Sequence, residues 1–319
     1  MFDVIIVGGG VAAFSAAIYS SRRGLKVLVI GKDVAGQANY TDAIQNYPGI
    51  EETGGFELVN NIRAQAEKFG AQFLLAEVTK IKPTDAGFVI TALGKQYKSE
   101  ALILAFGKTP QDLAVPGENE LKGKGVSYCA TCDAPLFKNK IVAIAGIGDI
   151  AADAGLQLAR FAKKVYILSK TDKFIANQAL NKALFKKPKV ELVGFIQIQE
   201  IVGENQLTSL KLLDLKTGQQ RSLAVDGLFV ELGYVVDSQI VQNIVELDEQ
   251  QQIIIDKNQA TSVPGIFACG DVTNSNYKQA VISAGEGATA ALACFDWLQR
   301  RKGSEGLSSD WTEIKRVRK

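Results

Sequence analysis

The chain begins MFDVIIVGGGVAAFSAAIYSS, residues 1–21, and this stretch decides the fold. The apolar run Phe2–Val7 has the length of a buried strand. Three consecutive glycines ending at Gly10 follow it, and an alanine-rich helical stretch continues to about Arg23. Leu25–Ile30 is a second apolar run. A strand, a glycine turn, a helix and a strand in this order predict an α/β fold that opens with a dinucleotide-binding unit.

The glycine turn has the form Gly8-x-Gly10-x-x-Ala13. Gly8 permits the tight turn, Gly10 lets the backbone approach a pyrophosphate, and Ala13 lets the helix pack closely on the strand. Free N–H groups at the helix N-terminus then bind the anion. The alternative is a tight turn without a ligand, which any α/β domain can contain. An acidic partner for a ribose is expected ~20 residues further on, and the nearest acid is Asp33.

The same pattern returns in the middle of the chain. Ile141–Ala145 is an apolar run, Gly146-x-Gly148-x-x-Ala151 is the turn, and Val165–Leu168 is the next apolar run after a helical stretch. A second dinucleotide site is one interpretation. The other is a duplicated fold that keeps the turn only for packing.

The composition limits the function. A chain of 319 residues predicts about two domains of ~100–200 residues each. The net charge of +2 argues against nucleic-acid binding, and the excess of Lys and Arg lies in residues 299–319. Because histidine is absent, a Ser-His-Asp triad, a histidine base and histidine-bound metals are excluded, and no metal site is expected. Apart from the glycine-interrupted start, no stretch is apolar enough to span a membrane, so we expect a cytoplasmic protein without a membrane partner.

The sequence has four cysteines, too few for a disulfide framework in a chain of this length. Cys129 and Cys132 form a Cys-x-x-Cys pair, which is typical of a zinc site, of two buried thiols or of a redox dithiol. A zinc site needs two further ligands at paired spacing, and none exists. A redox dithiol fits best, with Asp133 as the source of the proton that histidine would otherwise supply. Cys269 and Cys294 stand alone, and we expect both to be buried.

Six short motifs stand in the order found in low-molecular-weight thioredoxin reductases, and the chain resembles that family from residue 1 to about residue 298. They are Gly8-Gly9-Gly10, Ala35-Gly36-Gln37, Asn46-Tyr47-Pro48-Gly49, Cys129-Ala130-Thr131-Cys132-Asp133, Phe267-Ala268-Cys269-Gly270-Asp271 and Lys278-Gln279-Ala280. The cysteine motif is highly specific to that family, whereas the glycine turns are not.

The resemblance implies two Rossmann-like, three-layer ββα dinucleotide-binding domains, the second inserted into the first. Residues 1–111 and 246–319 would form the FAD-binding domain, with 299–319 as its C-terminal tail. Residues 112–245 would form the inserted domain, which carries the dithiol and an NAD(P)H-like fold. The resemblance also implies a homodimer whose two domains rotate, so that the dithiol alternates between the flavin and a partner protein.

The resemblance assigns roles to individual residues. Cys132 would lie against the flavin, Cys129 would attack the partner disulfide, and Asp133 would donate the proton. The residues that would contact FAD are Gly8, Gly10 and Ala13 at the pyrophosphate, Gln37 and Asn46 near the flavin, Gly270 and Asp271 on the ribitol side, and Lys278, Gln279 and Ala280 at the pyrimidine end of the ring.

The stretch expected to bind NADPH departs from the family. In place of the signature His-Arg-Arg-x-x-x-Arg stands Ser169–Ile175, which keeps one lysine in place of an arginine and adds the negative charge of Asp172. Lysine imitates poorly the arginine fork that grips a 2′-phosphate. Ile147 and Ile150 put bulky side chains into the second glycine turn. These residues favour another electron source, such as ferredoxin or a second flavin. The alternatives are an NADPH site that still works despite sequence drift and a site that has switched to NADH.

Trp311 is an isolated aromatic residue in the polar tail. It would either anchor the tail on its own subunit or stack on an isoalloxazine ring where a nicotinamide would otherwise lie.

Taken together, the sequence predicts an FAD-dependent dithiol–disulfide oxidoreductase of thioredoxin-reductase type. Electrons would pass from FAD through Cys129 and Cys132 to a protein disulfide such as that of thioredoxin. The alternatives are a working NADPH-dependent thioredoxin reductase and a flavin-binding redox sensor without turnover. The presence of both cysteines together with Asp133 favours the enzyme, because a sensor needs only one responsive thiol.

Overall fold

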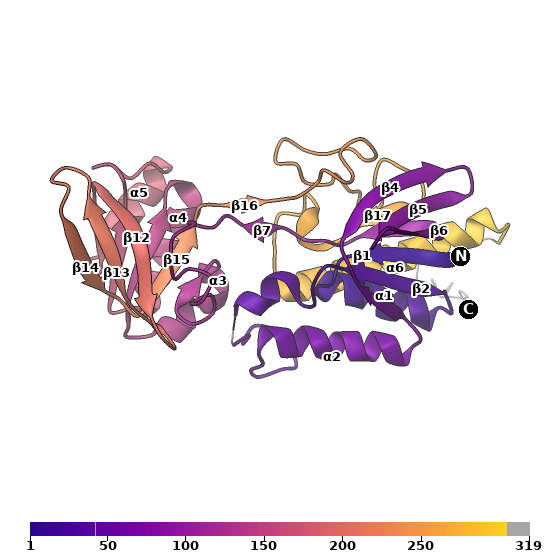
Figure 1. Cartoon of the computed structure of the whole chain (residues 1–319), viewed down its shortest axis with the longest axis horizontal. Coiled ribbons are helices and arrows are strands. Elements are labelled where there is room, and N and C mark those ends of the chain that lie inside the picture. Colours follow the sequence, from indigo (N-terminus) through magenta and orange to yellow (C-terminus); the bar gives the residue numbers. More distant parts are fainter. Residues whose placement is uncertain (42, 305–319) are drawn as a thin grey trace, which may run out of the picture. The chain divides into compact units, whose positions relative to one another are not determined.

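The structure is a computed structural model that describes residues 1–41 and 43–304, and the chain divides into two compact units (Figure 1). Unit 1 comprises Met1–Gly36, Val59–Gly107 and the chain from Val236 onward. Unit 2 comprises Gln37–Leu58 and Lys108–Val235. The chain therefore leaves unit 1 and returns to it. These bounds describe contacts within the chain and not cofactor binding, so the domain boundaries expected from the sequence stay a prediction.

A mixed sheet forms the centre of unit 1. Its strands follow the order β3-β2-β1-β6-β5-β4, and β17 pairs with β6. The strands are β1 (Phe2–Val7), β2 (Val27–Gly31), β3 (Gln72–Leu75), β4 (Val78–Thr84), β5 (Gly87–Ala92), β6 (Lys95–Leu104) and β17 (Ile266–Ala268). The pairs among β1, β2, β3, β6 and β17 are parallel, whereas β4 and β5 continue the sheet in antiparallel fashion. Parallel strands covered on both faces need nearly continuous apolar runs, and β1 and β2 have them.

Three longer helices accompany this sheet: α1 (Val11–Arg22), α2 (Gly55–Lys68), which begins in unit 2 and continues into unit 1, and α6 (Ala280–Arg301). In Figure 1, α1 and α6 lie side by side. Their backbones approach closely at Gly287, where a Cβ would lie 2.3 Å from the carbonyl oxygen of Ala12. The small residues of α1 and α6 therefore bring the two ends of the described chain together.

Unit 2 has three layers. Its central sheet is parallel and has the order β11-β10-β9-β15-β8. Its elements are β8 (Val126–Ser127), β9 (Ile141–Gly146), β10 (Lys164–Leu168), β11 (Val190–Val193) and β15 (Gly227–Glu231), with the helices α3 (Ala130–Asp133), α4 (Gly148–Phe161) and α5 (Gln178–Phe185). Alternate residues of β9 enter two cores: Val142 and Ile144 pack with α4, and Ala143 and Ala145 pack with a second sheet.

The second sheet of unit 2 is antiparallel and contains β12 (Ile196–Gly203), β13 (Leu207–Asp214) and β14 (Gln220–Ala224). A further antiparallel pair joins β7 (Thr109–Pro110) to β16 (Tyr234–Val235). Short 3-10 helices cover Gly36–Tyr40, Ala134–Phe137 and Gly270–Val272.

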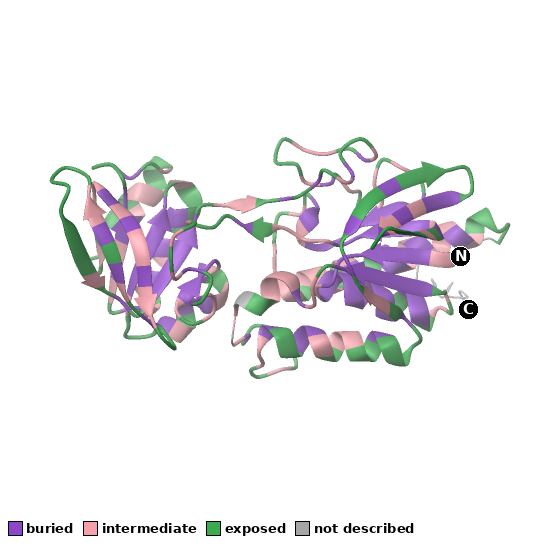
Figure 2. Ribbon diagram, in the orientation of Figure 1, coloured by how far each residue is buried: buried purple, intermediate pink, exposed green. Residues whose placement is uncertain are grey.

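Burial is concentrated in the strands of the two central sheets (Figure 2). Layers of helices on parallel sheets, together with antiparallel strands, confirm the predicted α/β fold class. Within residues 1–41 and 43–304, no helix is long and apolar enough to cross a membrane.

Candidate active site

The first glycine turn is enclosed by backbone on two sides. At Gly8 (φ +137°) a Cβ would lie 2.1 Å from the carbonyl oxygen of Ala105, and at Gly9 it would lie 1.9 Å from that of Asp33. Only glycine fits at such distances. At Gly10 the space around the Cβ position is open. The turn therefore joins the carboxyl ends of β1, β2 and β6 and leaves one side open above the start of α1.

The helix α1 presents an N-terminus to that open side. Its N-cap residue, Gly10, has no side chain that could cap the helix, and its first turn holds no acidic residue. Ala13 is fully buried in that turn, as close packing of α1 on the sheet requires. Exposed N–H groups and the positive end of the helix dipole attract anions. The turn therefore fits a pyrophosphate.

Asp33 follows β2, where an acid for a ribose was expected. Its Oδ1 accepts a hydrogen bond from the N–H of Gly36 at 2.9 Å and so orders the following turn. The N–H of Ala35 donates to the carbonyl oxygen of Gly9, also at 2.9 Å. Asp33 thus shapes the rim of the glycine turn, and its contact with a ribose stays a prediction.

The motif that contains Gly270 and Asp271 lies beside this turn. At Gly270 (φ +76°) a Cβ would lie 2.8 Å from the Cβ of Ala12 in α1. The N–H of Gly270 donates to Oε2 of Glu286 in α6 at 2.7 Å. Asp271 follows and is half-buried. The structure thus brings residues from the two ends of the described chain to one edge of the unit 1 sheet.

The helix α6 begins at the last of the predicted FAD motifs. Gln279 is its N-cap residue without a side-chain capping bond, and Ala280 is its first helical residue. Its first turn also lacks acidic residues. Lys278 is half-buried, and its Nζ donates to the carbonyl oxygen of Thr273 at 2.5 Å. Burial lowers the pKa of Lys278, because the charged ammonium loses part of its hydration.

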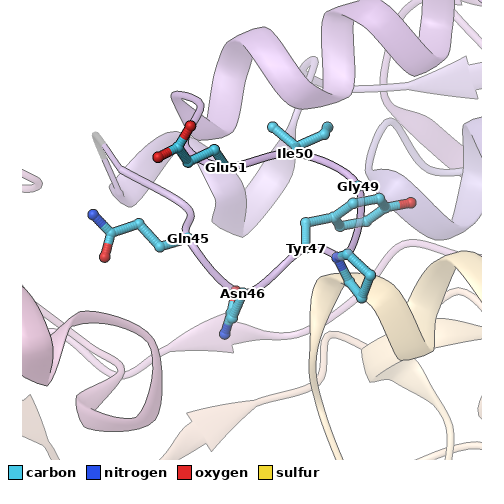
Figure 3. Close-up of a pocket in the computed structure, with 7 residues that line it drawn as sticks. Gln45, Asn46, Tyr47, Gly49, Ile50 and Glu51 are labelled. Carbon is cyan, nitrogen blue, oxygen red and sulfur yellow. The ribbon is translucent and has the colours of Figure 1, made fainter.

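Gln37 and Asn46 belong to the first segment of unit 2. Within the described residues, Nε2 of Gln37 is a buried donor without a hydrogen-bond partner. Such a group costs ~1–3 kcal/mol, so Gln37 fits a ligand that offers an acceptor. Asn46 is exposed to solvent and lines a pocket formed by the loop 45–51. In this loop the side chains of Gln45 and Tyr47 point in opposite directions (Figure 3). Burial raises the pKa of the Tyr47 phenol.

Cys129 and Cys132 are joined by a disulfide at the start of α3. Sγ of Cys129 accepts a hydrogen bond from the N–H of Cys132 at 3.2 Å. Both cysteines are half-buried, and Thr131 between them is exposed. A hydrogen bond to sulfur favours its charged form, so the arrangement favours Cys129 as the sulfur that becomes a thiolate on reduction.

Asp133 is buried next to the disulfide. Its Oδ2 accepts the O–H of Ser127 at 2.6 Å, and its Oδ1 accepts the O–H of Thr41 at 3.0 Å. Oγ of Ser127 in turn accepts the N–H of Cys129 at 3.1 Å. Ser127 therefore links the predicted proton donor to the backbone of the predicted nucleophile. Sequence analysis missed Ser127 and Thr41, because a single hydroxyl in a short strand or loop forms no recognisable motif.

Two further acids of unit 2, Glu118 and Glu231, are buried, and sequence analysis missed both. Glu118 accepts the O–H of Tyr128 at 2.8 Å and the N–H of Leu113 at 2.9 Å. Burial, reinforced by the negative charge of Glu118, raises the pKa of Tyr128. Glu231 is buried at the end of β15, and burial raises its pKa to about 8.

The second glycine turn shares the strand–turn–helix pattern of the first but differs in its side chains. Ile147 and Ile150 are 60% and 54% exposed at the start of α4. Asp149 places a carboxylate in the first turn of the helix. The N–H of Gly148 donates to the carbonyl oxygen of Ile175 at 2.7 Å. A negative charge, exposed apolar side chains and an occupied amide are each unfavourable for binding a dinucleotide pyrophosphate.

The loop Ser169–Ile175 begins with a buried serine, and Oγ of Ser169 accepts the N–H of Thr171 at 3.2 Å. Lys170 and Asp172 are exposed. A 2′-phosphate at this loop would meet a carboxylate beside the lysine and no arginine fork.

Cys269 and Cys294 are fully buried, as predicted, and burial raises the pKa of both thiols. In the part of the chain that the structure describes, no three His, Cys, Asp or Glu side chains gather as metal ligands would. Trp311 lies outside the described residues, so its stacking on a flavin stays a prediction.

Comparison with known proteins places this geometry in a family. Residues 2–287 match the model of the pyridine nucleotide-disulphide oxidoreductase family. The chain belongs to this family. Its members are flavin-dependent oxidoreductases that bind FAD, so the predicted family and enzyme class are confirmed.

Solved structures of thioredoxin reductases resemble the whole fold. That of Streptococcus pyogenes MGAS5005 has a TM-score of 0.90 and 32% identity and covers 94% of this chain and 99% of that one. That of Giardia duodenalis has a TM-score of 0.85 and 34% identity and covers 93% and 98%. Among curated relatives, an alkyl hydroperoxide reductase component of Staphylococcus aureus (strain MRSA252) is 38% identical over 301 residues, 94% of this chain and 59% of that protein. The chain thus spans less than two thirds of this curated relative.

Proposed function

We propose that the protein is a disulfide reductase of thioredoxin-reductase type, which passes electrons from FAD through Cys129 and Cys132 to a protein disulfide such as that of thioredoxin. The observation that carries the proposal is the disulfide at α3 with the buried carboxyl of Asp133, tied through Ser127 to the Cys129 backbone. A redox pair needs an accessible sulfur and a nearby proton donor. Both cysteines are half-buried rather than sealed in the core, as Cys269 is.

The exchange with the partner balances in electrons and protons. In the reduced pair, Asp133 accepts the proton of Cys129, whose thiolate attacks the partner disulfide and forms a mixed disulfide. The first partner sulfur leaves and takes the proton from Asp133. Cys132 then attacks Sγ of Cys129, which restores the intramolecular disulfide and releases the second partner sulfur with the Cys132 proton. One dithiol is oxidised and one disulfide is reduced.

The residues around the first glycine turn fit FAD, which when bound supplies the two electrons that reopen the disulfide. Gly8, Gly10 and Ala13 would hold its pyrophosphate at the N-terminus of α1. Within the described residues the buried Nε2 of Gln37 has no partner, so it would donate to the flavin. The remaining assigned contacts are Asp33, Asn46, Gly270, Asp271, Lys278, Gln279 and Ala280.

We infer that the electron donor is not NADPH, and we propose reduced ferredoxin or a second flavin in its place. The exposed Ile147 and Ile150 and the carboxylate of Asp149 at the second glycine turn support this inference, as does Asp172 in the following loop. A nicotinamide dinucleotide would bring further negative charge to both places. No step of the exchange with the partner depends on which donor is used.

A serine variant tests the role of the dithiol. With the flavin reduced chemically, Cys132→Ser should abolish reduction of thioredoxin disulfide while FAD stays bound. The matched control is Cys294→Ala, which removes a buried cysteine and should keep turnover. Turnover that persists in Cys132→Ser refutes the dithiol role, whereas loss of turnover in both variants points to a folding defect that FAD content and circular dichroism detect.

An anaerobic titration tests the donor. NADPH or NADH should leave the visible flavin band unchanged, while dithionite or reduced ferredoxin should bleach it. Rapid bleaching by NADPH would mean that the altered second site still works. The flavin released per chain then distinguishes a second flavin, which gives about two, from ferredoxin, which leaves one.

A second candidate partner follows from the 38% identity to the alkyl hydroperoxide reductase component. We propose that a peroxide-reducing dithiol protein competes with thioredoxin for the same dithiol. Comparing kcat/KM for the two oxidised partners decides between them, since a preference of tenfold or more for one is a difference of ~1.4 kcal/mol in transition-state binding.

We also propose a homodimer in a reducing, cytoplasmic compartment. The two buried cysteines, which stay unpaired, suit such a compartment. Sedimentation of the purified chain tests the dimer, and fractionation of the source cells tests the location.

A further inference from the structure

Tyr234 is a half-buried residue of β16 that the proposed exchange does not use. Its hydroxyl donates to the carbonyl oxygen of Tyr128 at 2.5 Å, although 106 positions separate the two residues in the sequence. That carbonyl belongs to the peptide unit that joins Tyr128 to Cys129. Tyr234 therefore contacts the backbone directly before the predicted nucleophile.

Both polar atoms of this peptide unit have a side-chain partner. The carbonyl oxygen accepts the O–H of Tyr234, and the N–H of Cys129 donates to Oγ of Ser127 at 3.1 Å. The C=O and N–H of a planar trans peptide point in opposite directions, so the two partners together fix the orientation of the plane. Ser127 also donates to Oδ2 of Asp133 at 2.6 Å. One peptide plane thus connects the backbone of Cys129 to the hydroxyl that holds the predicted proton donor.

The side chain of Tyr128 is anchored independently of Tyr234. Its hydroxyl donates to Oε1 of Glu118 at 2.8 Å and lies 3.0 Å from Oδ1 of Asp112. Glu118 is 2% exposed and accepts the N–H of Leu113 at 2.9 Å, while Nζ of Lys122 donates to Asp112 at 2.9 Å. Because these contacts hold the Tyr128 side chain, loss of the Tyr234 hydroxyl would free the Tyr128 carbonyl without displacing the residue.

Tyr234 is itself held by the strand pair to which it belongs. It pairs with Pro110 of β7, and Nζ of Lys108 lies 3.6 Å from the centre of its ring. A cation at this distance is attracted to the face of the ring. The second segment of unit 2 runs from Lys108 to Val235, so the β7–β16 pair joins the two ends of that segment. A phenylalanine at position 234 would keep the ring and its lysine and lose only the hydrogen-bond donor.

We infer that Tyr234 is a positioning residue for the dithiol: its hydroxyl fixes the peptide unit before Cys129 in the arrangement from which the disulfide with Cys132 closes. This inference rests on the proposed function, because it concerns the same dithiol. A disulfide requires two backbones at a set separation, here 5.3 Å between the Cα atoms. A dithiol whose backbone is already fixed loses less conformational freedom when the bond forms.

The consequence is a shift in the equilibrium between dithiol and disulfide. When oxidised dithiothreitol closes the pair, the two thiols give up two electrons and two protons, and dithiothreitol takes them up as its own two thiols. Tyr234→Phe should lower the equilibrium constant of this reaction about two- to tenfold, as expected for the loss of one hydrogen bond between neutral groups. The midpoint potential of the pair would then become less negative by ~10–30 mV.

The experiment equilibrates the whole flavoprotein anaerobically with mixtures of reduced and oxidised dithiothreitol. Free thiols are then alkylated, and mass spectrometry gives the fraction of chains in which Cys129 and Cys132 are reduced. The matched control is Tyr166→Phe, which removes the hydroxyl of another half-buried tyrosine of unit 2 whose ring also lies near a lysine, 5.4 Å from Nζ of Lys164. Hydrogen exchange at the Cys129 amide should be faster in Tyr234→Phe and unchanged in the control.

An equilibrium constant in Tyr234→Phe equal to that of the parent overturns the inference. An equal shift in both phenylalanine variants overturns it as well, because the effect would then not depend on the contact with the Tyr128 carbonyl. A shift in Tyr234→Phe alone, with faster exchange at the Cys129 amide, supports it. The measurement needs no electron donor and no partner protein, so a chain that fails to reduce thioredoxin would refute the proposed function and leave this test intact.

Discussion

Replacing Ser127 with alanine removes the link between Asp133 and Cys129. The serine donates to Oδ2 of Asp133 at 2.6 Å and accepts the Cys129 N–H at 3.1 Å. A hydrogen bond to a charged group contributes ~1.5–3 kcal/mol. If that contribution is made in the transition state of the exchange, its loss slows the reaction by about tenfold to 150-fold, since ~1.36 kcal/mol corresponds to a factor of ten.

The assay mixes the prereduced protein with oxidised thioredoxin and follows the formation of free thioredoxin thiols. Ser127→Ala should lower the maximal rate and leave the concentration of thioredoxin at half-maximal rate unchanged, because Ser127 is buried and positions an acid rather than binding the partner. Ser169→Ala, which alters another buried serine of unit 2, is the control and should keep the parent rate. A Ser127→Ala rate within twofold of the parent, with FAD bound, refutes the positioning role of Ser127.

Two further predictions concern packing and pH. Gly9→Ala should destabilise unit 1 by ~1–3 kcal/mol or more and lower the FAD content, because its Cβ would overlap the carbonyl oxygen of Asp33 at 1.9 Å; an unchanged urea midpoint and FAD content contradict the account. Cys269 and Cys294 should resist alkylation in the folded protein up to about pH 9, since burial raises their pKa, and mass spectrometry should find two modified cysteines in the reduced protein rather than four. Because the folded chain keeps these thiols neutral to higher pH than the unfolded chain, their contribution to the free energy of unfolding should decline above the ordinary thiol pKa of about 8.5.

Strong periodicity and glycine punctuation predict much of the fold. The bounds of β1 agree with the sequence prediction, and β9, β10 and the end of α1 differ from it by one residue. Sequence analysis missed β4 (Val78–Thr84), a mostly exposed edge strand with two lysines and Pro83, which lacks a clear apolar alternation. It also missed α5 (Gln178–Phe185), a short helix in a polar stretch.

The site could be predicted only where its residues form local motifs. The Cys129–Cys132 pair and Asp133 are adjacent in sequence, so their spacing alone indicates a dithiol with an acid. Ser127 lies six positions before Asp133 and Thr41 lies 92 positions before it, so neither hydroxyl forms a recognisable motif with this acid. A single buried acid or hydroxyl inside an apolar strand gives no periodic signal, and only the folded structure shows which amide or carboxyl it meets.

The central claim is that the disulfide stores electrons delivered through the flavin. Anaerobic reductive titration with dithionite measures this directly, by counting the electrons taken up per chain in the parent and in a variant with serine at both Cys129 and Cys132. The account predicts that the parent takes up about two electrons more than the variant, about four against two when one FAD is bound. A second flavin would raise both values equally and keep the difference. Equal uptake by the two proteins would contradict the account, because the pair would then be a structural disulfide that takes no part in electron transfer.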